Sequence, residues 1–300
     1  METKALINAA MMLAVYLVLL LLFTMGIFTT LLAIALPVPI IVFSVISKKY
    51  PEVLLLFIGC VIGSYLVASF PGLMATGLYG LSGAVLGISI IGNRPYWQRL
   101  LNASVVHLVG VPLFSLWVTG ISMADLLRES VGESIQLVEN LSPTTDLTHF
   151  SQAFDQILSD MLPAILLISG FITVFLTDKL AVFIMKRLRL EVPSMKKWES
   201  FQLGIVLAVT FLIGQLASHL DFSPVLRVVV FNLVLVLNLL FAVQGLVVIA
   251  AIFKSRGKAR IGFIIGVLMF ITGFVSVLSM VGVMDTLFNY RKRFALRSGV

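Results

Sequence analysis

Long apolar runs dominate the chain, and their length is the first feature that decides its fold. The hydrocarbon core of a bilayer is about 30 Å thick, which a helix of roughly 20 apolar residues can span. Nine segments qualify when this length is compared with the charged residues and the Pro and Gly breaks. They lie near residues 5–24, 26–47, 52–69, 72–92, 101–121, 161–185, 201–219, 225–253 and 261–284. The sequence therefore predicts an all-α fold, a polytopic transmembrane helical bundle of eight or nine spans.

The first two spans are hard to separate, because residues 5–46 are almost continuously apolar. Length requires two spans there, and either Gly26 or the Pro37 and Pro39 pair marks the bend. A proline at membrane depth frees backbone groups that only a neighbouring helix or a cavity can satisfy. The first run is too long for a signal peptide and no small-residue cleavage site ends it, so we expect it to stay in the mature chain.

The longest connection, residues 122–160, has a helical pattern of its own. Apolar residues recur on one face of a helix that continues from the fifth span: Met123, Leu127, Val131, Ile135 and Val138. A second set that begins at Phe150 runs into the sixth span, and residues 141–146 form the turn between them. This amphipathic hairpin either covers the outer mouth of the bundle as a lid or lies flat on the lipid headgroups.

Composition agrees with a membrane protein and excludes most other classes. Of the 300 residues 60% are hydrophobic and only 12% are charged, about half the charged share of an average globular chain. A net charge of +7 would suggest nucleic acid in a soluble chain, but here it indicates cytoplasmic loops facing anionic lipid, so no nucleic-acid partner is expected. The single cysteine, Cys60, excludes an intramolecular disulfide and a cysteine-based metal cluster. We expect no metal site and no cofactor.

Positive charge collects in alternate connections, which predicts the orientation. Lysines and arginines cluster at residues 48–49, 94–99, 186–197 and 254–260, whereas the connection at 122–160 is acidic. Because cytoplasmic loops carry the excess of Lys and Arg, these four connections and the N-terminus are predicted to be cytoplasmic. The tail Arg291-Lys292-Arg293 disagrees, since nine spans place it outside. Either one span is wrong or a short basic tail has been translocated.

Three side chains are candidates for binding a small molecule. Tyr79 and Trp117 lie on the outer half of their spans, where either a pocket or an interfacial aromatic belt would be. Asp178 lies within the sixth span, where a carboxylate is costly unless it is paired or hydrated. Asp178 either pairs with a neighbouring helix or belongs to a binding site.

Polar residues also mark the spans near the C-terminus. They are Gln215 and His219 in the seventh span and Arg227, Asn232, Asn238 and Gln244 in the eighth. Amide and imidazole side chains inside membranes more often bridge helices than bind a ligand. We therefore expect spans seven to nine to form a packed unit held by polar contacts.

Small residues recur at four-residue spacing, which allows helix backbones to approach closely in lipid. The pairs are Ala10/Ala14, Gly59/Gly63, Thr76/Gly80, Gly83/Gly87 and Gly262/Gly266. Most of them are expected to pack within the bundle. Ala10 and Ala14 lie on the terminal helix and are the pair expected to face another subunit.

One motif has the form of a catalytic site. Gly80-Leu81-Ser82-Gly83 matches the Gly-x-Ser-Gly pattern of rhomboid intramembrane proteases. That mechanism needs a histidine within hydrogen-bond reach of the serine. The three histidines lie at positions 107, 149 and 219. The sixth span, where a rhomboid has its catalytic histidine, therefore contains no histidine. We therefore expect that the protein is not an enzyme.

Two stretches near the N-terminus, Ala10-Met-Met-Leu-Ala14 and Leu36-Pro37-Val38-Pro39-Ile40, precede the glycine-rich third and fourth spans. Gln244-Gly245-Leu246 and the segment from Asp285 to Arg293 follow near the C-terminus. Together these stretches resemble the YybS-like family of bacterial integral membrane proteins. The first six spans are in turn similar to the substrate-binding S components of energy-coupling factor (ECF) vitamin transporters.

The S-component resemblance implies a six-helix unit that binds a small nutrient near its outer face. Such subunits dock on a membrane coupling subunit driven by two cytoplasmic ATPases, partly through an Ala-x-x-x-Ala face on their first helix. Ala10 and Ala14 match that face, and the segment 122–160 occupies the position of the fifth loop. Three additional C-terminal helices depart from the S-component pattern.

The resulting prediction has two domains, an S-component-like domain over residues 1–190 and a three-helix region over residues 191–300. We expect a multi-pass protein of the bacterial cell membrane that is a non-catalytic, small-molecule-binding or transport-related subunit. Its expected partners are the lipid bilayer, a small molecule and a coupling subunit with cytoplasmic ATPases. The alternative is a membrane scaffold or regulatory partner protein without a ligand.

Overall fold

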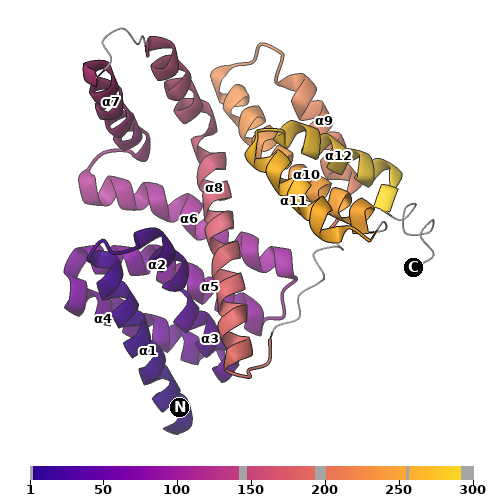
Figure 1. Cartoon of the computed structure of the whole chain (residues 1–300). Helices are drawn as coiled ribbons and strands as arrows, with labels where there is room; N and C mark the ends of the chain where they lie inside the picture. Colours follow the sequence, from indigo (N-terminus) through magenta and orange to yellow (C-terminus); the bar gives the residue numbers. More distant parts are fainter. Residues whose placement is uncertain (1–2, 142–146, 193–200, 255–256, 292–300) are drawn as a thin grey trace. The chain divides into compact units, whose positions relative to one another are not determined.

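Every regular element in the described part of the chain is helical (Figure 1). A computed structural model describes residues 3–141, 147–192, 201–254 and 257–291. The helices are α1 (Thr3–Thr24), α2 (Thr29–Ala35), α3 (Val38–Ser47), α4 (Tyr50–Ala75), η1 (Thr76–Gly80), α5 (Leu81–Ile91), α6 (Tyr96–Thr119), α7 (Met123–Leu141), α8 (Thr148–Arg187), α9 (Ile205–Ala217), α10 (Pro224–Lys254), α11 (Ala259–Ile271) and α12 (Val275–Phe288). Within these described residues, six helical stretches are long and apolar enough to cross a membrane. The predicted all-α polytopic bundle is confirmed.

The chain divides into two compact units. The first comprises residues 1–148 and 165–194, and the second comprises residues 149–164 and 195–300. Helix α8 contributes to both and changes unit between Ala164 and Ile165, next to Pro163. The division differs from a single boundary at residue 190, because the first part of α8 contacts α10 through side chains of the second unit.

Helix α3 is the buried centre of the first unit. All eight residues from Val38 to Val45 are buried. Gly83 and Gly87 of α5 approach α3 closely, since a Cβ atom at either position would lie within 3 Å of Pro37 or Ser44. The core combines side chains of α1, α3, α4 and α5 with residues beside them: Tyr16, Leu20, Leu36, Ile40, Phe43, Val53, Leu56, Cys60, Ala75 and Ala84.

The α2–α3 junction shows how a proline break is stabilised inside the bundle. Pro37 precedes the first residue of α3, so the helical hydrogen-bond pattern is interrupted there. The Thr177 hydroxyl of α8 donates to the carbonyl oxygen of Ile34 at 2.9 Å. This contact gives a carbonyl oxygen in the last turn of α2 a donor from a neighbouring helix.

Spans three and four form one continuous stretch of 42 residues, Tyr50–Ile91. The stretch is kinked where Ala68 and Ser69 leave the helical conformation, two residues before Pro71. This kink lies where the sequence separates the two spans. The turn that follows is the π-helix η1.

The amphipathic hairpin is present as two helices. Gly120, with φ of +71°, ends α6, and α7 starts after Ser122. The Ser122 hydroxyl accepts from the Asp125 backbone N–H at 3.2 Å and donates to its carboxylate, which lowers the pKa of Asp125. No residue of α7 is buried, and the turn at residues 142–146 lies outside the described residues.

Helix α10 is the centre of the second unit, and α12 crosses it with backbones in contact. A Cβ atom at Gly245 would overlap the carbonyl oxygen of Leu278, and one at Gly282 would overlap that of Phe241. Small residues permit this approach, which maximises dispersion contacts where lipid provides no hydrophobic drive. The core here consists of Ala208, Phe211, Leu237, Phe241 and Val283.

A fully buried amide, Gln244, holds the second unit together. Its Nε2 atom donates to the Gly282 carbonyl, to the Asp285 carboxylate and to the Thr286 hydroxyl at 2.9–3.1 Å. Its Oε1 atom accepts from the Leu203 backbone N–H at 2.9 Å. The prediction that amides bridge helices in this region is confirmed for Gln244.

The ninth predicted span, residues 261–284, is two helices rather than one. Helix α11 ends at Ile271 and α12 begins at Val275. Gly273 between them has φ of +85°, a conformation that a continuous helix cannot contain. The apolar run alone gave no signal for this break.

We expect the α10–α12 crossing to be intolerant of one methyl group. Gly245→Ala and Gly282→Ala should each lower stability by about 1–3 kcal/mol, because the added Cβ meets backbone that cannot rotate away. Thermal melting of the purified protein in detergent measures this. Gly132→Ala is the control, since no atom lies within 4 Å of an added Cβ there. Equal melting temperatures for all three variants would contradict the observed contact.

The Asp285–Arg291 ion pair supplies a second test. Asp285 is 1% exposed and accepts from Arg291 Nε and Nη2, both at 2.8 Å. Arg291→Met leaves this buried carboxylate without its cation and should cost about 3–5 kcal/mol in detergent unfolding. Lys48→Met removes an exposed ion pair with Glu191 and should cost no more than about 1 kcal/mol. Similar losses in the two variants would refute the structural role of the buried pair.

Candidate functional site

The π-helix η1 positions the first candidate residue, Tyr79. A π-helix has a wider turn than an α-helix and recurs at functional sites. The buried Tyr16 of α1 fixes this turn, because its hydroxyl donates to Thr76 Oγ1 at 2.8 Å. Gly80 lies against the same hydroxyl, 2.7 Å from where a Cβ atom would be.

Tyr79 lines a hollow of ≈340 Å³ in the first unit. Its walls come from the end of α1, from α2, from η1 and from α8: Phe23, Thr29, Thr30, Ala33, Ile34, Tyr79, Ile172, Thr173 and Leu176. None of these nine residues is charged. Four carry hydroxyl groups, and the rest are apolar.

Aromatic contacts hold the Tyr79 ring at the wall of this hollow. The ring meets Phe23 edge to face, with centroids 5.6 Å apart, and meets His107 of α6 at 5.8 Å. His107 is 5% exposed and packs against Gly170 of α8. A Cβ atom added at Gly170 would lie 2.6 Å from the Cβ atom of His107. The ring of Tyr79 therefore lies between two fixed neighbours.

The chemistry of the hollow suits a small ligand with few polar groups. Binding pockets of roughly 300–1,000 Å³ are mostly apolar and carry a small number of well-placed hydrogen-bonding groups. Thr173 donates its hydroxyl hydrogen to the Ser169 carbonyl at 2.9 Å, so its oxygen remains an acceptor. The absence of charge among the nine lining residues disfavours an ionised ligand.

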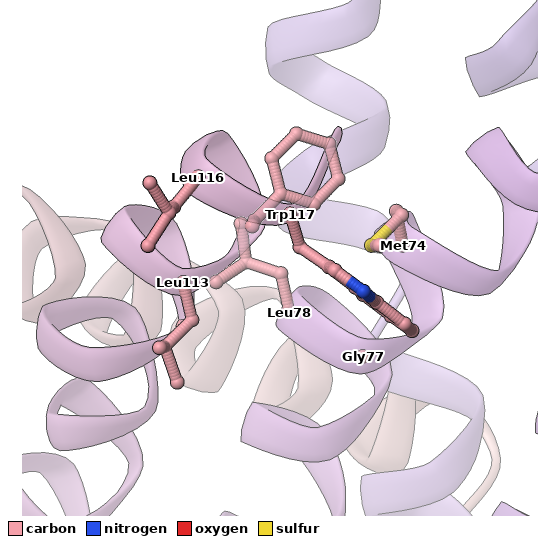
Figure 2. A pocket seen from close by; sticks show the side chains of 8 residues that line it. Met74, Gly77, Leu78, Leu113, Leu116 and Trp117 are labelled. Atoms are coloured by element: carbon pink, nitrogen blue, oxygen red, sulfur yellow. The ribbon is translucent and has the colours of Figure 1, made fainter. Parts of the chain in front are cut away.

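Trp117, the second candidate, lines a different hollow of ≈490 Å³. The walls come from α4, η1 and α6, and the Trp117 ring extends towards Met74 and Gly77 (Figure 2). Trp117 is 71% exposed, and its ring meets Phe70 with centroids 5.5 Å apart. An exposed indole on an apolar hollow is typical of a residue at the membrane interface.

Asp178, the third candidate, is paired with a neighbouring helix. It is 6% exposed and accepts a hydrogen bond of 3.2 Å from the Tyr96 hydroxyl of α6. Lys179 lies 5.3 Å from the centroid of the Tyr96 ring, and Arg99 lies 5.6 Å from it. The charge pattern predicts Arg99 in a connection, but it lies within α6 and is 6% exposed. Of the two alternatives that the sequence leaves open for Asp178, this hydrogen bond favours contact with a neighbouring helix.

The structure does not bring the three candidates into one site. Tyr79 and Trp117 line separate hollows, and Asp178 lines neither. Thr29, Thr30 and Thr173 also line the Tyr79 hollow but were not predicted from the sequence. Two adjacent threonines inside an apolar run are the signal that could have indicated two of them.

The predicted docking residues lie on the surface of the first unit. Ala10 and Ala14 are exposed, whereas Tyr16 and Leu20 form the buried side of α1. Leu13 and Leu17 instead meet Gly59 and Gly63 of α4. The small-residue face of α1 is therefore not used for packing within this unit.

The remaining candidate chemistry has simple structural roles. Ser82 donates its hydroxyl hydrogen to the Tyr79 carbonyl at 2.8 Å, and Gly83 packs against Pro37. Among the described residues, no group of three or more His, Cys, Asp or Glu side chains is placed to hold a metal ion.

Comparison with known proteins agrees with this architecture. The family model described as "Predicted membrane protein (DUF2232)" matches residues 12–286. The "Uncharacterized protein YybS" of Bacillus subtilis (strain 168) is 20% identical over 309 residues, covering 97% of this chain and 99% of that protein. No solved structure matches the chain. The match runs through both units, confirms the YybS-like resemblance and shows that the chain belongs to the DUF2232 family of predicted membrane proteins.

Proposed function

We propose that the first unit binds a small, largely apolar molecule in the Tyr79 hollow, as a non-catalytic binding or transport-related subunit. The observation that carries this proposal is an uncharged hollow beside a π-helix, with four hydroxyl-bearing residues among its apolar lining. Hydroxyl groups facing apolar walls orient a ligand without imposing the desolvation cost of a charge. If the first six spans are S-component-like, as their sequence pattern suggests, the ligand is a small nutrient.

The proposed setting is the bacterial cell membrane, with the N-terminus in the cytoplasm. Lys48 Nζ lies 2.6 Å from Glu191 Oε2 in the first unit. This contact joins the connection after α3 to the connection after α8, as expected if both basic connections lie on one side. The excess of Lys and Arg in these connections favours the cytoplasmic side.

The proposed partner is a membrane coupling subunit that works with cytoplasmic ATPases. The exposed Ala10 and Ala14 support this assignment, because a small-residue face lets a second helix approach closely. The same face also supports the second candidate function, a scaffold or regulatory protein that binds a partner but no ligand. The two functions differ in whether the Tyr79 hollow is occupied.

Retention of small molecules tests the hollow. We expect organic extracts of the detergent-purified protein to contain a small molecule, identified by mass spectrometry. Tyr79→Phe removes one hydrogen bond worth about 1 kcal/mol and should reduce retention about fivefold. Thr30→Trp should abolish retention by filling the hollow.

The matched control is Tyr65→Phe, because Tyr65 is 59% exposed and lies outside the hollow. It should retain wild-type amounts. Melting temperatures confirm that each variant is folded. Unchanged retention of every molecule in folded Tyr79→Phe and Thr30→Trp would reject the binding function.

Co-purification tests the docking face. Ala10→Leu together with Ala14→Leu fills the face with side chains and should remove the coupling partner from the purified complex. The melting temperature of the chain alone should stay the same, because both positions are exposed. Val67→Leu, at an exposed position on α4, should keep the partner.

Retention of every partner by the folded double variant would rule out docking through this face. Loss of a partner of another class, without a coupling subunit or ATPases, would favour the scaffold alternative.

A further inference from the structure

A hollow of ≈330 Å³ lies within the second unit, among α9, α10 and α12. Seven residues line it: Phe211, Gln215, Asn238, Ser276, Val277, Ser279 and Met280. None of them is ionisable. The lining therefore offers two carboxamides and two hydroxyls among apolar side chains.

Asn238 gives this hollow its chemical character. It lies near the middle of α10, between Arg227 and Lys254 towards the two ends. Its Oδ1 atom is buried and has no hydrogen-bond partner in the described part of the chain. A buried carbonyl oxygen without a donor is strongly unfavourable at membrane depth, where water does not replace the missing bond.

Another asparagine of the same helix shows what a structural amide looks like here. Asn232 Oδ1 accepts from the Ala164 backbone N–H at 2.7 Å. Its Nδ2 atom donates to the carbonyls of Asp160 and Val228. Asn232 is thus satisfied on both sides and links α8 to α10, whereas the oxygen of Asn238 is not satisfied.

The break between α11 and α12 provides donors beside the same hollow. Ser276 and Val277 lie in the first turn of α12, and no side chain caps its N-terminus. The first N–H groups of a helix have no acceptor within the helix. Non-helical backbone at membrane depth is tolerated where it is buried in protein or lines a cavity.

We infer that this hollow is a second binding site, for a small neutral molecule whose hydroxyl or amide group donates to Asn238 Oδ1. The ligand is expected to be neutral, because the seven lining residues are uncharged and offer no counter-charge to an ion. The apolar part of the ligand lies against Phe211, Val277 and Met280. The volume lies at the small end of known ligand pockets.

The test uses benzyl alcohol and toluene, two probes that differ by one hydroxyl group. Ser276→Cys places a thiol in the lining, and its labelling by N-ethylmaleimide is followed in the detergent-purified full chain. The native Cys60 is 0% exposed, and the unmodified chain measures its background. Each probe is titrated to the concentration that halves the labelling rate.

For each variant, the half-protecting concentration of benzyl alcohol is divided by that of toluene. Comparing this ratio between variants cancels the different partition of the two probes into micelles. Relative to toluene, benzyl alcohol should lose about fivefold in potency when Asn238→Leu or the smaller Asn238→Ala is introduced, since one hydrogen bond is lost. Asn232→Leu is the matched control. It should lower the melting temperature, because it removes satisfied hydrogen bonds, whereas the Asn238 variants should not.

Three outcomes would overturn the inference. Protection with the same ratio in all chains would mean an apolar hollow open to lipid or detergent. Absence of protection by either probe would mean that the hollow admits no ligand of this class. Loss of folding in both Asn238 variants would mean a structural amide. Because the site lies in the second unit, Tyr79→Phe should leave the ratio unchanged, which separates this test from that of the Tyr79 hollow.

Discussion

The structure depends on one constraint, that polar groups placed away from water must be satisfied by other parts of the chain. Thr177 supplies a donor to the carbonyl of Ile34 beside the α2–α3 break. Gln244 of α10 makes four hydrogen bonds. Three join it to α12, and one joins it to Leu203 in the segment before α9. At these two places, the break and the buried amide lie where a neighbouring segment is close enough to bond with them.

The same constraint distinguishes the Tyr79 hollow of the first unit and the Asn238 hollow of the second unit. In the first unit, Tyr79 of η1 lines an uncharged hollow together with residues of α2 and α8, several of which carry hydroxyl groups. In the second unit, Asn238 carries an oxygen that the chain itself does not satisfy. One hollow is thus lined by hydroxyl-bearing residues among apolar ones, and the other contains an oxygen without a donor.

Much of the fold could be predicted from local sequence, because span length depends only on consecutive residues. The amphipathic pattern of 123–138 likewise predicted α7. Gly26 and the Pro37/Pro39 pair were alternative positions for one bend, and the helices are interrupted at both. The site could not be predicted in this way. The Tyr79 hollow combines Thr29 with Thr173, and such pairings depend on how helices distant in sequence pack. The α11–α12 break was missed because an apolar residue pattern does not reveal the positive φ of Gly273.

The contacts of Asp285 have a consequence for how the protein is made. Gln244 leaves the ribosome long before Asp285 and Arg291, yet its donors are satisfied by residues of α12. During synthesis α10 must therefore wait in the translocation machinery or the lipid with these donors unmatched, until the end of the chain arrives. The Arg291 charge is neutralised only in that last step. The hydrogen bonds of Gln244 in the second unit are therefore completed only after α12 has been synthesised.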